Sequence, residues 1–348
     1  MIFRKLPDNP LISPRDLEPT RPDFEVYGIF NCAAAKIDGE YRLLLRVAEK
    51  PVEEPGWVFV PVLNEACDGI EVLHFRADGP EVIEANPRTL TLSGGRILLR
   101  SISHLRLARS SDGLDFTVQD EPALFPQTPF ERFGIEDPRV THLDGRWWVS
   151  YTAVSAMGIT AALASTRDWQ SFERHGIIFG PDNKDVAILP EKVGGLYACR
   201  HRPWSQGIGE AGLWTASSPD LLHWGRHARL IAPRAGNWDG ERVGAGPPPI
   251  RTRRGWLDLY HGAGPEGRYC MGALVTDLED PTRVLARSTD PVLEPTEPYE
   301  TTGVYAPVVF ACGAVAEPDG ALRLYYGAAD TSVCCATAGV EDLLSSAS

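Results

Sequence analysis

Apolar and polar residues alternate along short segments of this chain, and turn residues separate one segment from the next. The alternation is clear at 42–47, 147–152 and 257–260. Successive side chains of a β-strand point to opposite faces, so a period of two predicts strands that are buried on one side. Only the stretch around 340–344 has the pattern of a short helix. The sequence therefore predicts an all-β protein.

Two kinds of turn recur along the chain. One is a Ser or Thr followed by Asp and then an aromatic residue, as at 110–116, 166–169 and 218–224. The other is a glycine turn before a strand rich in aromatic residues or leucine, repeated every 50 to 65 residues. Its glycines are Gly95, Gly145, Gly195, Gly255 and Gly320. Five units of this length, each with three or four antiparallel strands, predict a five-bladed β-propeller that forms a single domain.

One further glycine turn, at Gly39, does not fit this spacing. It either starts a sixth blade or belongs to the first blade, with an insertion at about 50–92 before the rest of that blade. A two-domain β-sandwich is the main alternative fold, but the regular repeat favours the propeller. Because the innermost strands of a propeller line a central channel, polar residues on those strands are the candidates for chemistry.

Composition narrows the class of protein. The 348 residues are 43% hydrophobic and 23% charged, which is ordinary for a globular protein. Acidic residues exceed basic ones, with a net charge of −13, so nucleic acid is not an expected partner. No apolar run is long enough to cross a bilayer, and the start of the chain lacks the pattern of a secretion signal. We therefore expect no membrane partner and a cytoplasmic location.

The seven cysteines are scattered, with no CxxC pair, so the sequence predicts neither a disulfide framework nor a zinc site. Histidines and carboxylates also do not cluster at the spacing that metal ligands need. We therefore expect no metal.

Two adjacent acids, Glu136 and Asp137, precede Pro138 at the start of a predicted inner strand. Alternation predicts that only one of them faces the channel. A carboxyl held there away from water would have a raised pKa and could act as a general acid. An acid that caps a turn beside a proline is the alternative. The same tripeptide at 279–281 follows a predicted outer strand, and we interpret that copy as structural.

Cations gather around one predicted hairpin of this acidic chain. Lys192 precedes its glycine turn, and His201 and Arg202 follow it. Such a group is suited to phosphate or another oxyanion, because arginine offers planar donors and lysine a point charge. A solvated hairpin with ordinary ion pairs fits the spacing equally well.

Aromatic residues accompany polar ones at two other places. Trp238, in a segment rich in glycine and proline, could stack on a sugar face or pack between blades. Asp330, which follows two tyrosines, could bind a sugar hydroxyl or simply end a strand. Aromatic faces, carboxylates and cations around a channel predict sugar binding, and an oxyanion cluster makes cleavage by phosphate attractive.

The chain resembles glycoside hydrolase family 130, a family of five-bladed β-propeller mannoside phosphorylases and mannosidases. The resemblance extends from 31 to about 344, and it rests on several motifs in one order rather than on any single motif. The segments that carry it are 134–139, 182–185, 190–192, 201–203, 242–250 and 325–330.

The resemblance implies roles for individual residues. Asp137 matches the family's single catalytic acid, which protonates the glycosidic oxygen through a hydroxyl of the mannosyl unit while phosphate attacks the anomeric carbon from the opposite face. The product would be α-mannose 1-phosphate. The residues implied to bind phosphate are Lys192, His201, Arg202, Arg46 and Arg100. Those implied to bind the sugar are Asn31, Glu136, Arg139, Asp185, Asp239, Arg242, Tyr269 and Asp330.

The resemblance thus predicts an inverting phosphorylase that takes a β-1,2- or β-1,4-linked mannoside and inorganic phosphate, without a cofactor. A β-mannosidase that uses water is the first alternative, and the basic cluster argues against it because family members without that cluster are hydrolases. A non-catalytic sugar-binding propeller is the alternative from another class. The insertion at about 50–92 is expected to reshape the acceptor side of the channel, and a homo-oligomer is compatible with the sequence.

Overall fold

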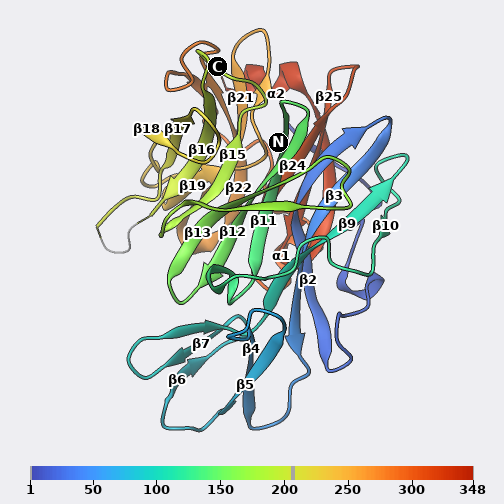
Figure 1. Cartoon of the computed structure of the whole chain (residues 1–348). Coiled ribbons are helices and arrows are strands. Elements are labelled where there is room, and N and C mark those ends of the chain that lie inside the picture. Colours follow the sequence, from blue (N-terminus) through green and yellow to red (C-terminus); the bar gives the residue numbers. More distant parts are fainter. Residues whose placement is uncertain (1, 205–207, 348) are drawn as a thin grey trace.

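The computed structural model describes residues 2–204 and 208–347 and consists almost entirely of antiparallel sheets (Figure 1). Each of the five main sheets has a row of four hydrogen-bonded strands, and the sheet of blade 4 carries one extra short strand. Their innermost strands lie against one another: β2 contacts β24 and β11, and β15 contacts β11 and β19. This arrangement is a five-bladed β-propeller, which confirms the predicted fold class and rejects the β-sandwich.

Each blade is described from its innermost strand outward. Blade 1 contains β2 (Phe24–Ile37), β3 (Glu40–Pro51), β9 (Ile102–Ser110) and β10 (Thr117–Val118). Blade 2 contains β11 (Ile135–Leu143), β12 (Arg146–Ser155), β13 (Gly158–Thr166) and β14 (Glu173–Phe179). Blade 3 contains β15 (Asn183–Ile188), β16 (Tyr197–Pro203), β17 (Leu213–Ser218) and β18 (Gly225–Ile231).

The last two blades follow the same order. Blade 4 contains β19 (Arg242–Ala245), β21 (Trp256–Ala263), β22 (Tyr269–Thr276) and β23 (Val284–Arg287), and β20 (Ile250–Arg251) also pairs with β21. Blade 5 contains β24 (Val309–Ala316), β25 (Ala321–Ala328), β26 (Ser332–Gly339) and β1 (Arg4–Lys5). Two short α-helices, α1 (Pro298–Thr301) and α2 (Val340–Ser346), flank blade 5, and α2 matches the predicted helix at the end of the chain.

The predicted turns join neighbouring strands of the blades, with one exception. The turn of Gly39 joins the two inner strands of blade 1, whereas that of Gly95 lies between β7 and β8 of the insertion. Assigning Gly95 to a blade was therefore wrong, and Gly39 starts no sixth blade. The Ser/Thr–Asp turns lie between third and fourth strands, where Asp112, Asp168 and Asp220 accept hydrogen bonds from backbone N–H groups.

The insertion lies between the second and third strands of blade 1. It forms a two-stranded sheet and a three-stranded sheet, built from β4 (Trp57–Leu63), β5 (Ile70–Arg76), β6 (Val82–Ala85), β7 (Thr89–Leu92) and β8 (Ile97–Leu99). These strands project from one end of the propeller (Figure 1). An apolar cluster that includes Val60, Leu90 and Leu98 packs around Phe133 of the propeller and fixes the insertion in place.

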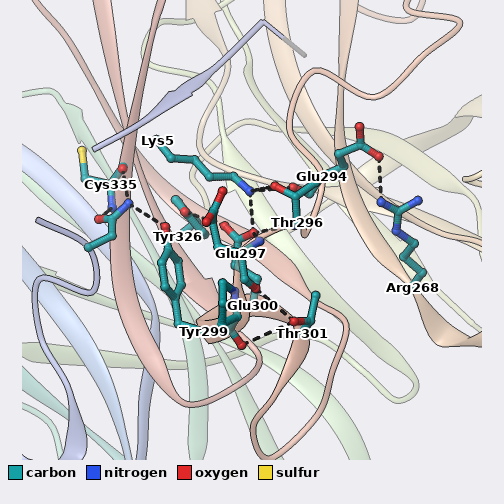
Figure 2. A network of polar contacts seen from close by, with 12 residues as sticks. Lys5, Arg268, Glu294, Thr296, Glu297, Tyr299, Glu300, Thr301, Tyr326 and Cys335 are labelled. Atoms are coloured by element: carbon teal, nitrogen blue, oxygen red, sulfur yellow. Dashed lines mark hydrogen bonds and ion pairs between the residues drawn. The ribbon is translucent and has the colours of Figure 1, made fainter. Parts of the chain in front are cut away.

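The ring is closed by the N-terminal segment, because β1 pairs with β26 and supplies the fourth strand of blade 5. The ammonium of Lys5 is held by the Glu300 carboxylate, the Thr296 hydroxyl and the carbonyl of Glu294 (Figure 2). Glu300 also accepts a hydrogen bond of 2.8 Å from the hydroxyl of Tyr326. The side chains of Lys5 and Glu300 are both buried, so this ion pair ties the first residues of the chain to its last blade.

Three blades contain the same buried polar group, which consists of an acid before the innermost strand, a tyrosine on the second strand and a cation on the fourth. The three members are Glu300, Tyr326 and Lys5 in blade 5, Glu131, Tyr151 and Arg174 in blade 2, and Asp239, Tyr260 and Arg287 in blade 4. Because the group recurs at the same place in the repeat, its role is to fasten the inner and outer strands of a blade.

Candidate active site

The innermost strands of the first three blades each contain a bulge. The strand register shifts after Phe30 in β2, after Glu136 in β11 and after Lys184 in β15. At each shift a polar residue has a positive φ: 50° at Asn31, 50° at Asp137 and 58° at Asp185. Asn and Asp tolerate this left-handed conformation better than most residues.

The bulges change which side chains face the channel, because a bulge adds a residue to one strand and interrupts its alternation. Strict alternation predicted that only one of Glu136 and Asp137 would face the channel. Both line the cavity, so that prediction was wrong. In β15 the same irregularity places Lys184 on the cavity while Asp185 is buried behind it.

A cavity of about 210 Å³ lies where these strands meet. The residues singled out from the sequence that line it are Asn31, Arg46, Glu136, Asp137, Arg202, Arg242, Tyr269 and Asp330. The other residues that line it are Arg88, Ile159, Lys184, Trp204, Tyr305, Val308 and Phe310. All five blades contribute, together with one residue of the insertion.

Asp137 is buried and held by two donors at one oxygen. The side-chain amide of Asn31 and the guanidinium of Arg46 each donate to its Oδ1 at 2.9 Å. Burial opposes ionisation, but the charges of Arg46, Lys184 and Arg139 outweigh burial and hold the pKa of Asp137 below its usual value. The raised pKa expected from the sequence is therefore wrong for the protein without ligands, in which Asp137 is ionised at neutral pH.

Arg46 joins the two adjacent acids. It donates to Glu136 at 2.7 Å as well as to Asp137, and its guanidinium lies 4.5 Å from the centre of the Phe30 ring. The pKa of Arg46 rises despite burial, because both carboxylates favour its charged form. Arg46 lines the cavity as predicted, and it donates hydrogen bonds to both acids.

On the cavity lining lies a group of cations, Lys184, Arg202 and Arg242, which we call the basic wall. Arg242 donates to the hydroxyl of Tyr269 at 3.1 Å. Lys184 has no carboxylate within ion-pair distance in the parts of the chain that the structure describes. An ammonium and two guanidiniums converging on one cavity form a site for a dianion.

Arg202 of the basic wall is oriented from behind. Its Nε lies 3.2 Å from Asp185 Oδ2, and its Nη1 lies 3.3 Å from Nε2 of His261. Burial lowers the pKa of His261 to about 3, so this imidazole is neutral. Its other nitrogen, Nδ1, donates to the carbonyl of Ala245 at 3.2 Å, which leaves Nε2 to accept from Arg202.

Two residues predicted to bind the sugar, Asp185 and Arg139, lie behind the cavity surface instead. Arg139 donates to the carbonyls of Ala245 and Gly246 and lies 3.3 Å from Asp185. The pKa of Asp185 is lowered despite burial, chiefly by the charge of Arg202, with the charge of Arg139 adding to the effect. The pair therefore cross-links the innermost strands of blades 2, 3 and 4.

Asp330 lies in the turn after β25 and lines the cavity, as predicted. Burial raises its pKa to about 6, and the charges of Arg88 and Arg46 only partly oppose this. Arg88 Nη2 lies 3.8 Å from Asp330 Oδ2, and the Arg88 guanidinium is stacked 4.5 Å above the Tyr305 ring. A carboxyl with this pKa changes between its neutral and ionised forms around pH 6.

Besides Asp185 and Arg139, four more predicted residues do not line the cavity. Lys192 is exposed on the turn between β15 and β16 of blade 3, where it lies 3.4 Å from Asp144. Arg100 donates to Glu53 and to a carbonyl of the insertion. Their side chains are committed to these partners.

The other two are buried within blades. His201 stacks on Phe179 at 4.6 Å between ring centres, and burial lowers its pKa to about 3. Asp239 belongs to the acid–tyrosine–cation group of blade 4, and Trp238 beside it stacks on Tyr260 as core. Both positions fit a structural role better than contact with a ligand.

The sequence reasoning missed Lys184, Arg88, Tyr305 and His261. Lys184 lies inside a segment that carried the family resemblance, beside Asp185, and only the bulge decides that the lysine faces the cavity. Arg88 belongs to the insertion, whose path back to the cavity has no local signal. Within the described residues, no three His, Cys, Asp or Glu side chains are placed to hold a metal ion together.

Comparisons with known proteins show which family the chain belongs to. A protein 46% identical over 341 residues, covering 97% of this chain and 96% of its own, is the beta-1,2-mannobiose phosphorylase of Listeria innocua. A solved structure of the Listeria innocua enzyme, in complex with beta-1,2-mannobiose, matches with a TM-score of 0.96 at 45% identity and covers 100% of this chain and 99% of that one. A 1,2-beta-oligomannan phosphorylase of Thermoanaerobacter is 34% identical, covering 86% of this chain and 98% of its own.

A family model described as beta-1,4-mannooligosaccharide phosphorylase matches residues 96–347. This match spans more than half of the chain and includes most of the residues around the cavity. The chain belongs to glycoside hydrolase family 130.

Proposed function

We propose that this chain transfers a mannosyl unit from a β-1,2-linked mannoside to inorganic phosphate. The two relatives reported above are named as phosphorylases of β-1,2-linked mannosides, which favours phosphorolysis and the β-1,2 linkage over β-1,4. The observation that carries the proposal is the basic wall, which faces the same cavity as the Asp137 carboxyl.

The reaction needs one acid and one bound nucleophile. A phosphate oxygen held by Lys184, Arg202 and Arg242 attacks the anomeric carbon, and the bond from that carbon to the glycosidic oxygen breaks. The leaving oxygen takes a proton that Asp137 supplies through a hydroxyl of the transferred mannosyl unit. The products are α-mannose 1-phosphate and the shortened saccharide, so configuration is inverted and no redox change occurs.

Phosphate also provides a reason for Asp137 to become protonated. The cations that depress its pKa include Lys184 of the basic wall. A dianion bound there offsets that positive charge, so the pKa of Asp137 rises when phosphate binds. The acid is then loaded with a proton only in the complex that contains the nucleophile.

A β-mannosidase on this scaffold would use water in place of phosphate. It would need a second carboxylate as a base, at the position from which the nucleophile attacks. The described residues of that wall are cations, and a cation cannot act as the base that takes a proton from water. A non-catalytic sugar-binding propeller would leave the paired Asp137 and basic wall without a role.

We further propose that inorganic phosphate is a co-substrate and that no cofactor or metal takes part. The partners are the mannoside and phosphate, with neither nucleic acid nor membrane. No described helix combines the length and apolar character of a membrane span. All seven cysteines are free thiols, which supports a reducing, cytoplasmic location. A homo-oligomer stays a prediction.

The test is a panel of β-1,2- and β-1,4-linked mannobioses, assayed at increasing phosphate concentration. We expect the rate to saturate with phosphate and to be greatest for the β-1,2-linked substrate. Rates that are independent of phosphate would contradict the proposal. Asp137→Asn is the matched control, because it keeps shape and size while removing the titrating group: it should bind mannobiose yet fail to turn it over.

A further inference from the structure

The insertion reaches the cavity through a single side chain. Among the described residues that line the cavity, only Arg88 comes from the strands and turns between β3 and β9, and all others come from blades or from loops between blades. Arg88 lies in the turn between β6 and β7. The insertion is therefore built onto blade 1 in a way that adds one cation to the cavity.

The turn that carries Arg88 is held firmly. The side-chain oxygen of Asn86 accepts hydrogen bonds of 2.9 Å from the backbone N–H groups of Arg88 and Thr89. Arg100 donates to the carbonyl of Asn86 at 2.8 Å, and the hydroxyl of Tyr27 in blade 1 donates to the carbonyl of Pro87. Arg100, which the sequence suggested for phosphate, thus supports the loop that presents Arg88.

The guanidinium of Arg88 is held in position, but its hydrogen-bond donors are not all used. It is stacked on Tyr305, and its nearest acid, Asp330, lies at 3.8 Å, beyond hydrogen-bond distance. The Arg88 side chain is 47% exposed, whereas that of Asp330 is 14% exposed. The structure gives Arg88 no side-chain hydrogen bond to the described residues, so its donors are available to a ligand.

The gap between Arg88 and Asp330 fits a sugar hydroxyl. A hydroxyl accepts one hydrogen bond and donates another, so it can accept from a guanidinium and donate to a carboxylate. Both residues also line a side pocket of about 70 Å³ that includes Glu136 and Arg46 but no member of the basic wall. The gap is thus on the side of the acids, where the sugar lies, and away from the phosphate.

We propose that Arg88 is a specificity-determining residue, which together with Asp330 binds one hydroxyl of the transferred mannosyl unit. This inference rests on the proposed phosphorolysis. It makes the insertion a recognition element for the donor sugar rather than for the phosphate. The residue contacts the substrate but exchanges no proton with it.

The first measurement compares Arg88→Ala with the wild type under β-1,2-mannobiose and phosphate. We expect kcat/KM for mannobiose to fall by at least about tenfold, since a hydrogen bond from a charged donor is lost. The KM for phosphate should stay within about twofold of wild type. Arg96→Ala is the control, because Arg96 is an exposed arginine of the same insertion, and it should leave both constants unchanged.

The second measurement uses mannobioses that lack one hydroxyl of the transferred unit. In the wild type, one deoxy analogue should lose at least about tenfold in kcat/KM, and in Arg88→Ala the same analogue should lose almost nothing further. Equal losses in both proteins, or a rise in the KM for phosphate instead, would overturn the inference. If the wild type itself releases no mannose 1-phosphate, the proposed function fails rather than the role of Arg88.

Discussion

The pKa values of two carboxyl groups in the cavity are shifted in opposite directions by their surroundings. Cations hold the pKa of Asp137 below its usual value, while burial raises the pKa of Asp330 to about 6. Environments that separate two acids in this way assign them different tasks. In the proposed reaction, Asp137 would receive its proton when phosphate binds, and Asp330 would offer the sugar either an acceptor or a donor, depending on pH.

Replacing Asp330 tests its raised pKa through stability. Ionising this group costs free energy only in the folded state, so the wild type loses stability as pH rises from about 4 through about 6. Asp330→Asn removes this titration. The variant should be more stable than wild type at about pH 8, by up to about 3 kcal/mol, and equally stable at about pH 4.

Urea unfolding at both pH values measures the difference. A variant that is less stable than wild type at about pH 8 would show that the Arg88 and Arg46 charges outweigh burial at Asp330.

Lys184 should govern both phosphate binding and the titration of Asp137. Lys184→Met removes a charged donor, so the KM for phosphate should rise by about tenfold or more. It also removes a charge that depresses the pKa of Asp137, so the pKa should move upward. The fall of kcat/KM for mannobiose with rising pH should then move to higher pH, as a pH profile would show.

The matched control is Lys192→Met, the lysine that the sequence suggested and that the structure pairs with Asp144 outside the cavity. It should leave the KM for phosphate and the pH profile unchanged. An equal effect of the two substitutions would contradict the assignment of Lys184 to the basic wall.

At the scale of the element, the blades are fastened by a recurring buried group and shaped by bulges. In blade 5 the cation of this group comes from the start of the chain, since Lys5 takes the place that Arg174 has in blade 2. The ring is thereby closed by an ion pair as well as by the pairing of β1 with β26. The stability of the propeller should therefore depend strongly on Lys5, although the strand that carries it has only two residues.

Lys5→Met should destabilise the fold by about 3 kcal/mol or more, because it leaves the Glu300 carboxylate buried without a cation. Thermal or urea unfolding measures the loss. Arg4→Met, one residue earlier on the same strand and exposed, is the control and should cost almost nothing. In the double variant with Glu300→Gln part of the stability should return. Equal losses for Arg4→Met and Lys5→Met would contradict the role given to the ion pair.

At the scale of the whole molecule, much of the fold could be predicted because it repeats. Alternating strands, glycine turns and Ser/Thr–Asp turns are local signals, and five copies indicate a propeller. The failure at Gly95 has the same origin, since a hairpin of the insertion uses the same turn chemistry as a blade. Which hairpin pairs with which sheet depends on long-range contacts that no local pattern records.

The site could be predicted only in part. Asp137 and Asp330 were found because acids beside proline or tyrosine on inner strands stand out. A bulge changes the side that a residue faces, and the bulge in β15 turns Lys184 to the cavity, whereas Lys192 lies in the turn beyond that strand. Asp239 has the sequence context of a ligand-binding acid, yet it belongs to the acid–tyrosine–cation group of blade 4. Only the repeat of that group in other blades shows that its role is structural.

The central claim, that phosphate on the basic wall receives the mannosyl unit, is tested most directly by product stoichiometry. Proton and phosphorus NMR would follow β-1,2-mannobiose and phosphate with the wild-type protein. For each disaccharide consumed, we predict one mannose and one α-mannose 1-phosphate, with an equal loss of inorganic phosphate. Two molecules of mannose for each disaccharide, with inorganic phosphate unchanged, would show that water is the nucleophile and would contradict the account.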